Sequence, residues 1–220
     1  MSVVVVKVGG AVAKAAARQV QALVTQTHEV VLVHGAGPQI TAEMERRGLP
    51  VEFVDGRRVT DAAALDVVRE SLAGVNKALC EALGPRALPL PDGVLDAVPV
   101  PGLGLVGDPQ PSAPAAVVDA LAAGLVPVVA PLARGPLNVN GDEAAAALAV
   151  GLGAERLVFV TDVPGVLVEG VVAAELPADE AERLIGDGAF TDGIVPKLLA
   201  AARAARLGVA AEIGETVVTA

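Results

Sequence analysis

The chain has 220 residues, which suits one large α/β domain or two closely associated lobes. Its 26 acidic and 16 basic side chains give a formal charge of −10, and this excess disfavours DNA and anionic membrane surfaces as partners. A single Cys excludes an intrachain disulfide, and the absence of Trp and Tyr disfavours stacking on nucleic-acid bases.

The N-terminal segment places a lysine inside an apolar run. Lys7 interrupts the valines of residues 3–8, a pattern typical of a central parallel strand. Burying an unpaired ammonium is costly, so a partner must lie near. Gly9 and Gly10 follow directly and allow a ligand to approach the backbone, and a phosphate suits this setting. The alternative is an edge strand from which Lys7 reaches water.

The same segment shows no targeting signal. It lacks a basic start, and Lys7 splits the apolar stretch, so we do not expect a signal peptide. No run of about 18 apolar residues is without a charge or a proline, so no transmembrane helix is predicted. We therefore expect a soluble, cytoplasmic protein, in which Cys80 is a buried structural thiol.

Short β-branched runs then alternate with Ala- and Leu-rich segments of helical length. This alternation predicts βαβ crossovers, and hence an α/β fold of three αβα layers around a mostly parallel central sheet. Strands are predicted at 30–33, 126–130, 157–160, 209–213 and 216–219, and helices near 11–27, 38–48, 61–83, 113–124, 141–153 and 197–208.

The stretch from residue 88 to 114 is rich in Pro and Gly. It predicts a loop or a short hairpin at the edge of the main sheet, with a disordered linker as the alternative. A second compact unit is expected to begin near Pro136, where a polar cluster opens a new αβ run. We therefore expect an N-terminal lobe of residues 1–136 and a C-terminal lobe of residues 137–220.

A glycine-rich turn follows the second predicted strand. Residues 34–38, His-Gly-Ala-Gly-Pro, lead from that strand into a helix, where unpaired N–H groups can face an anion. The turn matches neither of the two standard nucleotide-binding fingerprints and is weak evidence alone. His34 could be a base, but a His at a strand end more often orients its loop.

A polar cluster precedes the helix predicted at 141–153. Alternate side chains of an extended segment share a face, so Asn138, Asn140 and Asp142 could converge. Asp142 could then supply the counter-charge that Lys7 lacks. Capping of the helix is the alternative, although one cap explains only one of these three side chains.

Two further turns complete the set. Residues 161–166 follow the strand at 157–160, and residues 191–197 place Lys197 at the start of a helix. The macrodipole disfavours a cation at that position unless an anion also binds there. Two lysines with an aspartate available to both favour a phosphoryl-transfer site.

These residues resemble the amino acid kinase family, and within it most of all the N-acetylglutamate kinases, in a short form. Seven motifs occur in the family's order and span nearly the whole chain, which makes the resemblance specific. They are KVGG at 7–10, HGAGPQI at 34–40, DGRRVTD at 55–61, AGVNK at 73–77, NVNGD at 138–142, TDVPGV at 161–166 and GIVPK at 193–197.

The resemblance implies transfer of the ATP γ-phosphoryl group to the side-chain carboxylate of N-acetyl-L-glutamate, a step of arginine biosynthesis. Lys7 and Lys197 would stabilise the transferring phosphoryl group, and Asp142 would orient both. Magnesium would be carried by the ATP phosphates, with no metal site on the protein. The lobe of residues 1–136 would bind the amino acid and form a homodimer, and residues 137–220 would bind ATP.

The resemblance also implies the binding residues. Arg58 would pair with a substrate carboxylate, and its neighbour Arg57 is expected to be a solvated surface charge. Asn138 and the main chain of Ala36 and Gly37 would hold the substrate. The nucleotide would be bound by Gly9, Gly10, Asp162, Val163, Pro164, Gly165, Val166, Leu167, Ala189, Phe190 and Thr191.

The sequence departs from the family in several places. Ala36 replaces the middle one of three successive glycines, and alanine resists positive φ. The 88–114 stretch and the C-terminal part are shorter than usual, and no N-terminal helical extension indicates inhibition by arginine. A kinase for carrier-bound aminoadipate or glutamate is one alternative, disfavoured by the charge of −10. A non-catalytic nucleotide-binding protein is another, disfavoured by Lys7, Asp142 and Lys197 occurring together.

Overall fold

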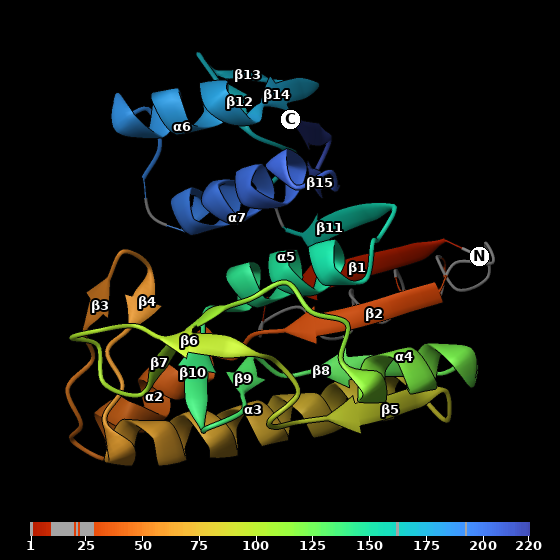
Figure 1. Cartoon of the computed structure of the whole chain (residues 1–220). Helices are drawn as coiled ribbons and strands as arrows, with labels where there is room; N and C mark the ends of the chain where they lie inside the picture. Colours follow the sequence, from red (N-terminus) through yellow and green to blue (C-terminus); the bar gives the residue numbers. More distant parts are fainter. Residues whose placement is uncertain (1, 10–19, 21, 23–28, 162, 192) are drawn as a thin grey trace.

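An eight-stranded sheet forms the centre of the molecule in the computed structural model, which describes residues 2–9, 20, 22, 29–161, 163–191 and 193–220 (Figure 1). The order is β14-β16-β15-β11-β1-β2-β8-β5, and every neighbouring pair is parallel except β15–β16. The mostly parallel sheet is therefore confirmed. Its strands are β1 (Val3–Val8), β2 (Glu29–His34), β5 (Ala87–Leu90), β8 (Val126–Val129), β11 (Arg156–Val160), β14 (Glu175–Pro177), β15 (Ala210–Ile213) and β16 (Thr216–Thr219).

Helices cover both faces of this sheet. Five of them match predicted segments, whereas α6 was not among the predicted elements, and the helix predicted near 11–27 lies almost wholly outside the described residues. The last helix begins at Ile194, so Lys197 lies in its first turn. The helices are α2 (Gly37–Arg46), α3 (Ala62–Leu83), α4 (Ala115–Ala122), α5 (Gly141–Gly151), α6 (Ala178–Gly186) and α7 (Ile194–Arg206).

The alternation of side chains along β1 divides the core between the two faces. Val4, Val6 and Val8 pack with Leu79 of α3, whereas Val5 shares a cluster with the alanines of α5 and α7. Small side chains on these helices let them approach the sheet and each other closely. Three αβα layers result, as predicted, and the face with α5 is the one toward which odd-numbered residues of β1 point.

The segment from 88 to 114 contains a short hairpin, as predicted, but the hairpin belongs to a second sheet and not to the edge of the main sheet. β5 is the edge strand of the main sheet, and the following chain forms part of a second, four-stranded sheet in the order β6-β7-β10-β9. The disordered-linker alternative is wrong. Gly107 explains part of the difference, because a Cβ there would lie 2.8 Å from the Ala97 Cβ atom. The strands are β6 (Ala97–Pro99), β7 (Val106–Pro109), β9 (Leu132–Ala133) and β10 (Leu137–Val139).

Two small hairpins stand apart from these sheets: β3 (Phe53–Val54) with β4 (Arg57–Arg58), and β12 (Leu167–Val168) with β13 (Val171–Val172). The turn between β3 and β4 has φ of 49° at Asp55 and 74° at Gly56. Positive φ at both central residues is the pattern of a type I′ turn, for which Asp-Gly is a typical sequence. The predicted elements do not include this hairpin, although its turn signal is present.

The strands of both predicted lobes meet in one sheet, because β1 and β11 are direct neighbours. The division at residue 136 stays a prediction.

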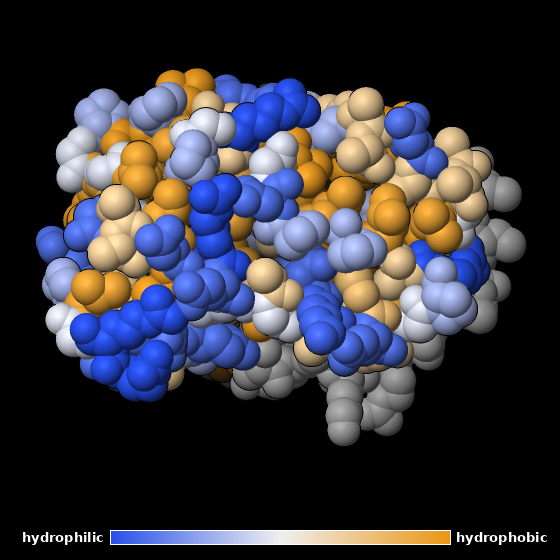
Figure 2. Space-filling view, turned by 90° about the horizontal axis from the view of Figure 1, so that it is seen from below, coloured by the Kyte–Doolittle hydropathy of each residue, from blue (hydrophilic) through white to orange (hydrophobic). Residues whose placement is uncertain are grey.

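Seen from the side of α3 and β5, the surface mixes hydrophilic and hydrophobic side chains (Figure 2). Within the described part of the chain, no helix combines the length and apolarity that crossing a membrane requires.

Candidate active site

Lys7 lies near the end of a strand that is paired on both sides. Its neighbours in register are Phe159 of β11 and Val33 of β2, so the edge-strand alternative is wrong. Lys7 points to the face covered by α5, where its Nζ atom lies 2.7 Å from Asp142 Oδ1, and both side chains are 11% exposed. The partner that a buried ammonium requires is thus present.

Asp142 lies in the first turn of α5. Asn140 caps this helix, and its Oδ1 atom accepts hydrogen bonds from the main-chain N–H groups of Asp142 and Glu143, at 2.8 and 3.2 Å. A carboxylate at a helix N-terminus is favoured by the macrodipole. Burial opposes the charge of Asp142, but Lys7 and Lys197 outweigh it and hold the pKa of this carboxyl below its ordinary value. Asp142 is therefore ionised near neutral pH.

Lys197 completes the constellation from α7. Its Nζ atom lies 3.3 Å from the same Asp142 oxygen and 5.2 Å from the centre of the Phe159 ring. The N-cap of α7, Gly193, provides no side-chain hydrogen bond to the first turn. Two ammonium groups thus share one carboxylate beside a helix N-terminus that has no side-chain cap, and this arrangement favours additional negative charge.

Arg58 supplies a third cation, and it is almost completely buried, with 6% exposure. Its guanidinium donates to Thr41 Oγ1 at 2.7 Å and lies 4.5 Å from the centre of the Phe53 ring. Burial lowers the pKa of Arg58. Among the described residues, none provides this guanidinium with a carboxylate partner, so a ligand carboxylate would supply the missing charge.

A cavity of about 180 Å³ is lined by Lys7, Asp142 and Arg58, whereas Lys197 reaches it only through its contact with Asp142. Six residues predicted to bind or act on the substrate line it, namely Lys7, Ala36, Gly37, Arg58, Asn138 and Asp142. Apolar side chains of Ile40, Leu72 and Val106 line the same space. Asn138 Nδ2 donates to Thr60 Oγ1 at 3.0 Å, which fixes the amide in the wall. The pocket thus combines charged and apolar surfaces.

Ala36 enters this wall without backbone strain. It is the N-cap residue of α2, with φ of −144°, and its side chain is buried beside Ile40 and Met44. The expected conflict between alanine and a positive φ at this position does not arise, because the backbone of Ala36 has a negative φ. The position keeps its N–H group and needs no left-handed conformation.

The residues predicted to bind a nucleotide occupy three places. Phe190 and Thr191 line a second, larger cavity of about 1000 Å³ between the β3–β4 hairpin and the helices α6 and α7, and Phe53 lines both cavities. Gly9 follows β1 directly, and Ala189 precedes Phe190. Gly10 and Asp162 lie outside the described residues.

The turn at 163–167 is held by the β15–β16 hairpin. The main-chain N–H of Val166 donates to Thr216 Oγ1 at 2.8 Å, and a Cβ atom on Gly165 would lie 2.6 Å from a methyl carbon of Val172. The side chain of Val166 is buried in the core, so only its main chain could face a ligand. This turn is not among the residues that line either cavity.

All three aromatic residues of the chain lie around this site. Phe53 stacks on Arg58, Phe159 lies beneath Lys197, and Phe190 lines the second cavity. Phe53 and Phe159 are not among the predicted site residues. Their rarity is the signal that could have drawn attention to them, because a chain with 1% aromatic residues fills most of its core with aliphatic side chains.

Arg57 also differs from its prediction as a solvated surface charge. Its side chain is 21% exposed, lines the smaller cavity and forms ion pairs with Asp108 and Glu143. No sequence pattern near Arg57 indicates these partners, which lie 51 and 86 residues away.

His34 is fully buried, and it lies on the face of the main sheet opposite to that of Lys7. Its Nδ1 atom lies 3.4 Å from the Gly35 carbonyl, and its Nε2 atom lies 3.0 Å from Asn76 Nδ2. Since the carbonyl can only accept, Nδ1 carries the proton and Nε2 accepts from Asn76. The ring holds its loop and α3 together, as the structural interpretation predicted, and is no base for the cavity.

The buried imidazole predicts a pH-dependent stability. Burial lowers the pKa of His34 to about 4, and the bond to Gly35 only partly opposes this. The folded state therefore favours the neutral ring, so its stabilising contribution is complete above the unfolded pKa near 6.5 and is lost as the pH falls toward 4. We expect a loss of about 3 kcal/mol in the free energy of unfolding over that range.

Urea unfolding at pH 7, 5.5 and 4 measures this loss, with His34→Gln as the comparison. Carboxylates and the other His titrate in both proteins. The difference between the two proteins in how the free energy of unfolding depends on pH therefore isolates His34. The same pH dependence in both proteins would contradict the prediction.

Comparison with known proteins agrees with this geometry. The sequence model that describes the "Amino acid kinase family" matches residues 2–214 of this chain. Acetylglutamate kinase of Rubrobacter xylanophilus is 44% identical over 97% of this chain and 88% of its own, and that of Geobacillus stearothermophilus is 40% identical over 90% and 83%. The solved structure of smu.665 from Streptococcus mutans UA159 superposes with a TM-score of 0.86 at 28% identity, covering 99% of this chain and 98% of its own.

Proposed function

The chain belongs to the amino acid kinase family, and from this we propose that it is an acetylglutamate kinase. It transfers the γ-phosphoryl group of ATP to the side-chain carboxylate of N-acetyl-L-glutamate and forms N-acetyl-L-glutamyl 5-phosphate, a reaction of arginine biosynthesis. One observation carries the proposal: a lysine–aspartate–lysine cluster adjoins a cavity in which a buried arginine lacks a carboxylate among the described residues.

The chemistry follows from charge. A carboxylate is already a nucleophile near neutral pH, so the reaction requires no general base. Its difficulty is that two anions must meet, and the ammonium groups of Lys7 and Lys197 offset their repulsion. Asp142 holds both groups on one oxygen, at 2.7 and 3.3 Å, so they are aimed at one point before any ligand arrives. This is preorganised electrostatic stabilisation of the transferred phosphoryl group.

The cavity supports a small, N-blocked acidic amino acid as the acceptor. The Arg58 guanidinium would bind the α-carboxylate, and Asn138 with the main chain of Ala36 and Gly37 would hold the rest of the substrate. The apolar wall around Ile40 suits the acetyl methyl group. The side-chain carboxylate would then extend toward Lys7, which lines the same cavity.

For the nucleotide, the proposal places ATP along Gly9, the 163–167 turn and 189–191. The described residues contain no group of three or more His, Cys, Asp or Glu that could hold a metal ion. We propose that magnesium is carried by the ATP phosphates, where it would supply charge neutralisation. We further propose a cytoplasmic homodimer, formed through residues 1–136.

A hydroxylamine-trapping assay with ATP and magnesium tests the acceptor, because acyl phosphates react with hydroxylamine to give hydroxamates. We expect a strong signal with N-acetyl-L-glutamate and little with glutamate, aspartate or N-acetyl-aminoadipate. An N-blocked substrate fits because the apolar side chains of Ile40, Leu72 and Val106 in the wall suit an acetyl group better than an ammonium. Signal from glutamate or aspartate alone would contradict the substrate, and ATP binding without any hydroxamate would favour a non-catalytic protein.

A further inference from the structure

Four charged side chains form a network beside the cavity. Arg57 donates through Nε to Glu143 at 3.0 and 3.1 Å and through Nη2 to Asp108 Oδ1 at 2.7 Å. Arg203 donates to the same Asp108 oxygen at 3.1 Å. We call Arg57, Asp108, Glu143 and Arg203 the charge clasp. It contains two guanidinium groups and two carboxylates, so its formal charges balance.

Two members of the clasp, Arg57 and Asp108, come from the N-terminal half of the chain. Each of them lies next to a residue or a strand of the substrate pocket. Arg57 directly precedes Arg58 on β4. Asp108 lies on β7, which is the parallel partner of β10, the strand that carries Asn138. A shift of either clasp residue would therefore move a side chain that the proposed function assigns to substrate binding.

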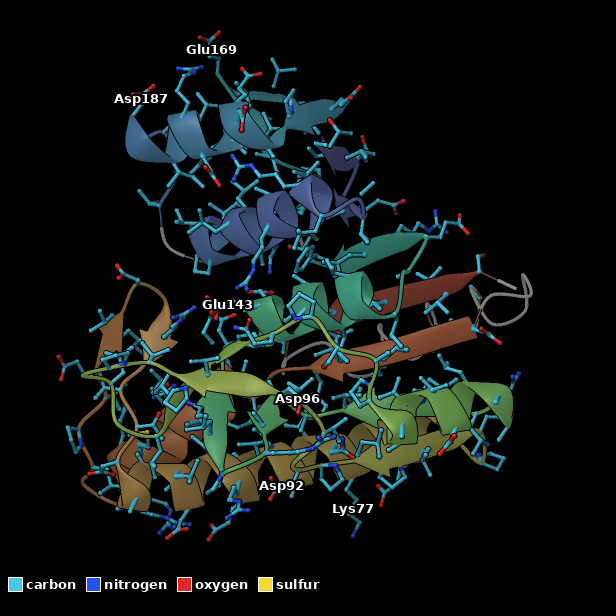
Figure 3. All side chains as sticks on the ribbon, viewed as in Figure 1. Lys77, Asp92, Asp96, Glu143, Glu169 and Asp187 are labelled. Carbon is cyan, nitrogen blue, oxygen red and sulfur yellow. The ribbon has the colours of Figure 1, made fainter. Side chains whose placement is uncertain are left out.

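The other two members lie on the helices that carry the phosphoryl-binding groups. Glu143 follows Asp142 in the first turn of α5, and Arg203 lies on α7 with Lys197. Figure 3 shows Glu143 at the start of α5, in the space between the β3–β4 hairpin and α7. The clasp thus connects four elements, each of which positions one group of the site.

The hairpin that carries Arg58 depends on such a connection. Among the described strands, β3 and β4 pair only with each other. Asn140 Nδ2 donates to the Gly56 carbonyl at 3.0 Å, and the turn packs against Pro196, because a Cβ atom on Gly56 would lie 2.7 Å from the Pro196 Cγ atom. The two ion pairs of Arg57 are the charged contacts that hold this hairpin to α5 and β7.

The Arg57–Glu143 pair of the clasp is more enclosed than an exposed surface pair such as Arg69–Asp92. The side chains of Arg57 and Glu143 are 21% and 20% exposed, those of Asp108 and Arg203 are 32% and 38% exposed, and those of Arg69 and Asp92 are 44% and 41% exposed. Burial raises the pKa of Glu143, and its bonds to Arg57 only partly oppose this. Removing one partner would leave an enclosed charge without compensation, unlike removal of an exposed partner.

We propose that the charge clasp positions the substrate-binding hairpin against α5 and α7, so that Arg57, Asp108 and Arg203 are positioning residues for phosphoryl transfer. None of them needs to touch a reacting atom. The hairpin sets where Arg58 holds the substrate, and α7 sets where Lys197 meets the phosphoryl group. This inference rests on the proposed function, and it assigns a task to residues outside the lysine–aspartate cluster.

The test compares Arg57→Met, Asp108→Asn and the double variant with the wild-type protein. Hydrogen exchange of the amides at 52–60 measures how firmly the hairpin is held, without any substrate. Kinetics with ATP and N-acetyl-L-glutamate measure KM and kcat. Arg69→Met is the matched control, since it removes an exposed arginine from an exposed pair.

We expect faster exchange of the hairpin amides in both single variants, a KM for the acceptor raised about tenfold and a kcat lowered by a similar factor. In the double variant, amide exchange, KM and kcat should be changed no more than in the more impaired single variant, because both substitutions break the same network. Arg57→Lys should recover part of the loss, and Arg69→Met should match the wild type in every readout.

Wild-type exchange rates in the hairpin of Arg57→Met would overturn the proposal, as would losses that multiply in the double variant. Because exchange needs no substrate, failure of the wild-type protein to phosphorylate N-acetyl-L-glutamate would contradict the proposed function instead. Faster hairpin exchange would support the clasp in that case as well.

Discussion

Replacing Lys7 or Lys197 with alanine is expected to lower kcat about 10²–10³-fold while the protein still folds. Each substitution removes one of the two ammonium groups that offset the charge of the transferring phosphoryl group. The remaining lysine still neutralises Asp142, so neither variant leaves a buried carboxylate unpaired. Steady-state kinetics with saturating ATP and N-acetyl-L-glutamate measure kcat, and circular dichroism with thermal unfolding measures the fold.

Lys77→Ala is the matched control, because Lys77 is 79% exposed and its only ion pair, with Glu81, spans 4.0 Å among the described residues. It should retain full turnover. The double variant Lys7→Ala with Lys197→Ala tests the shared carboxylate, since it leaves Asp142 buried alone and should lose stability as well as turnover. Near-normal kcat in either folded single variant would refute the role given to that lysine.

Arg58→Met is expected to change activity and stability in opposite directions. The KM for N-acetyl-L-glutamate should rise about 10²-fold or more, because a charge-assisted bidentate contact contributes roughly 3 kcal/mol to binding. In the absence of ligand the free energy of unfolding should rise by about 1 kcal/mol, because the substitution removes a buried charge that lacks a carboxylate partner. Methionine keeps the apolar contact with Phe53 and Met44.

Urea unfolding without ligand and substrate titrations of the same preparation measure the two effects. Arg46→Met provides the comparison, because Arg46 is 69% exposed and lies on α2 outside the cavity lining. An unchanged KM in Arg58→Met would remove this arginine from the substrate site. A large loss of stability would show that the guanidinium has a structural task instead.

The sequence predicted those parts of the site that lie at the ends of apolar strands. A lysine within a valine run and an aspartate after a polar cluster each break a local pattern. Such breaks are expected where a functional requirement conflicts with the residue preferences of a stable fold. The alternation of strands and helices likewise predicted a parallel sheet, which places strand ends at one edge. Local patterns were therefore sufficient to predict that Lys7, Asp142 and Lys197 come together.

Contacts between distant segments could not be predicted in this way. The partners of Arg57 depend on how the β3–β4 hairpin folds over α5, and no local pattern encodes that distance. The proline-rich stretch at 88–114 was predicted only in part, because its hairpin joins a second sheet through β7, which pairs with β10 some thirty residues later in the chain. Pro99 and Pro109 end strands and Pro89 lies within the edge strand β5, so composition indicated a loop or a short hairpin, with a disordered linker as the alternative.

The placement of the three phenylalanines has a practical consequence for spectroscopy. A chain without Trp or Tyr has almost no intrinsic near-ultraviolet absorption or fluorescence of the indole and phenol kind. A single tryptophan in place of Phe190 would thus be the sole emitter of the protein, located in the wall of the larger cavity. Its emission could follow the filling of that cavity in real time, without background from any other residue.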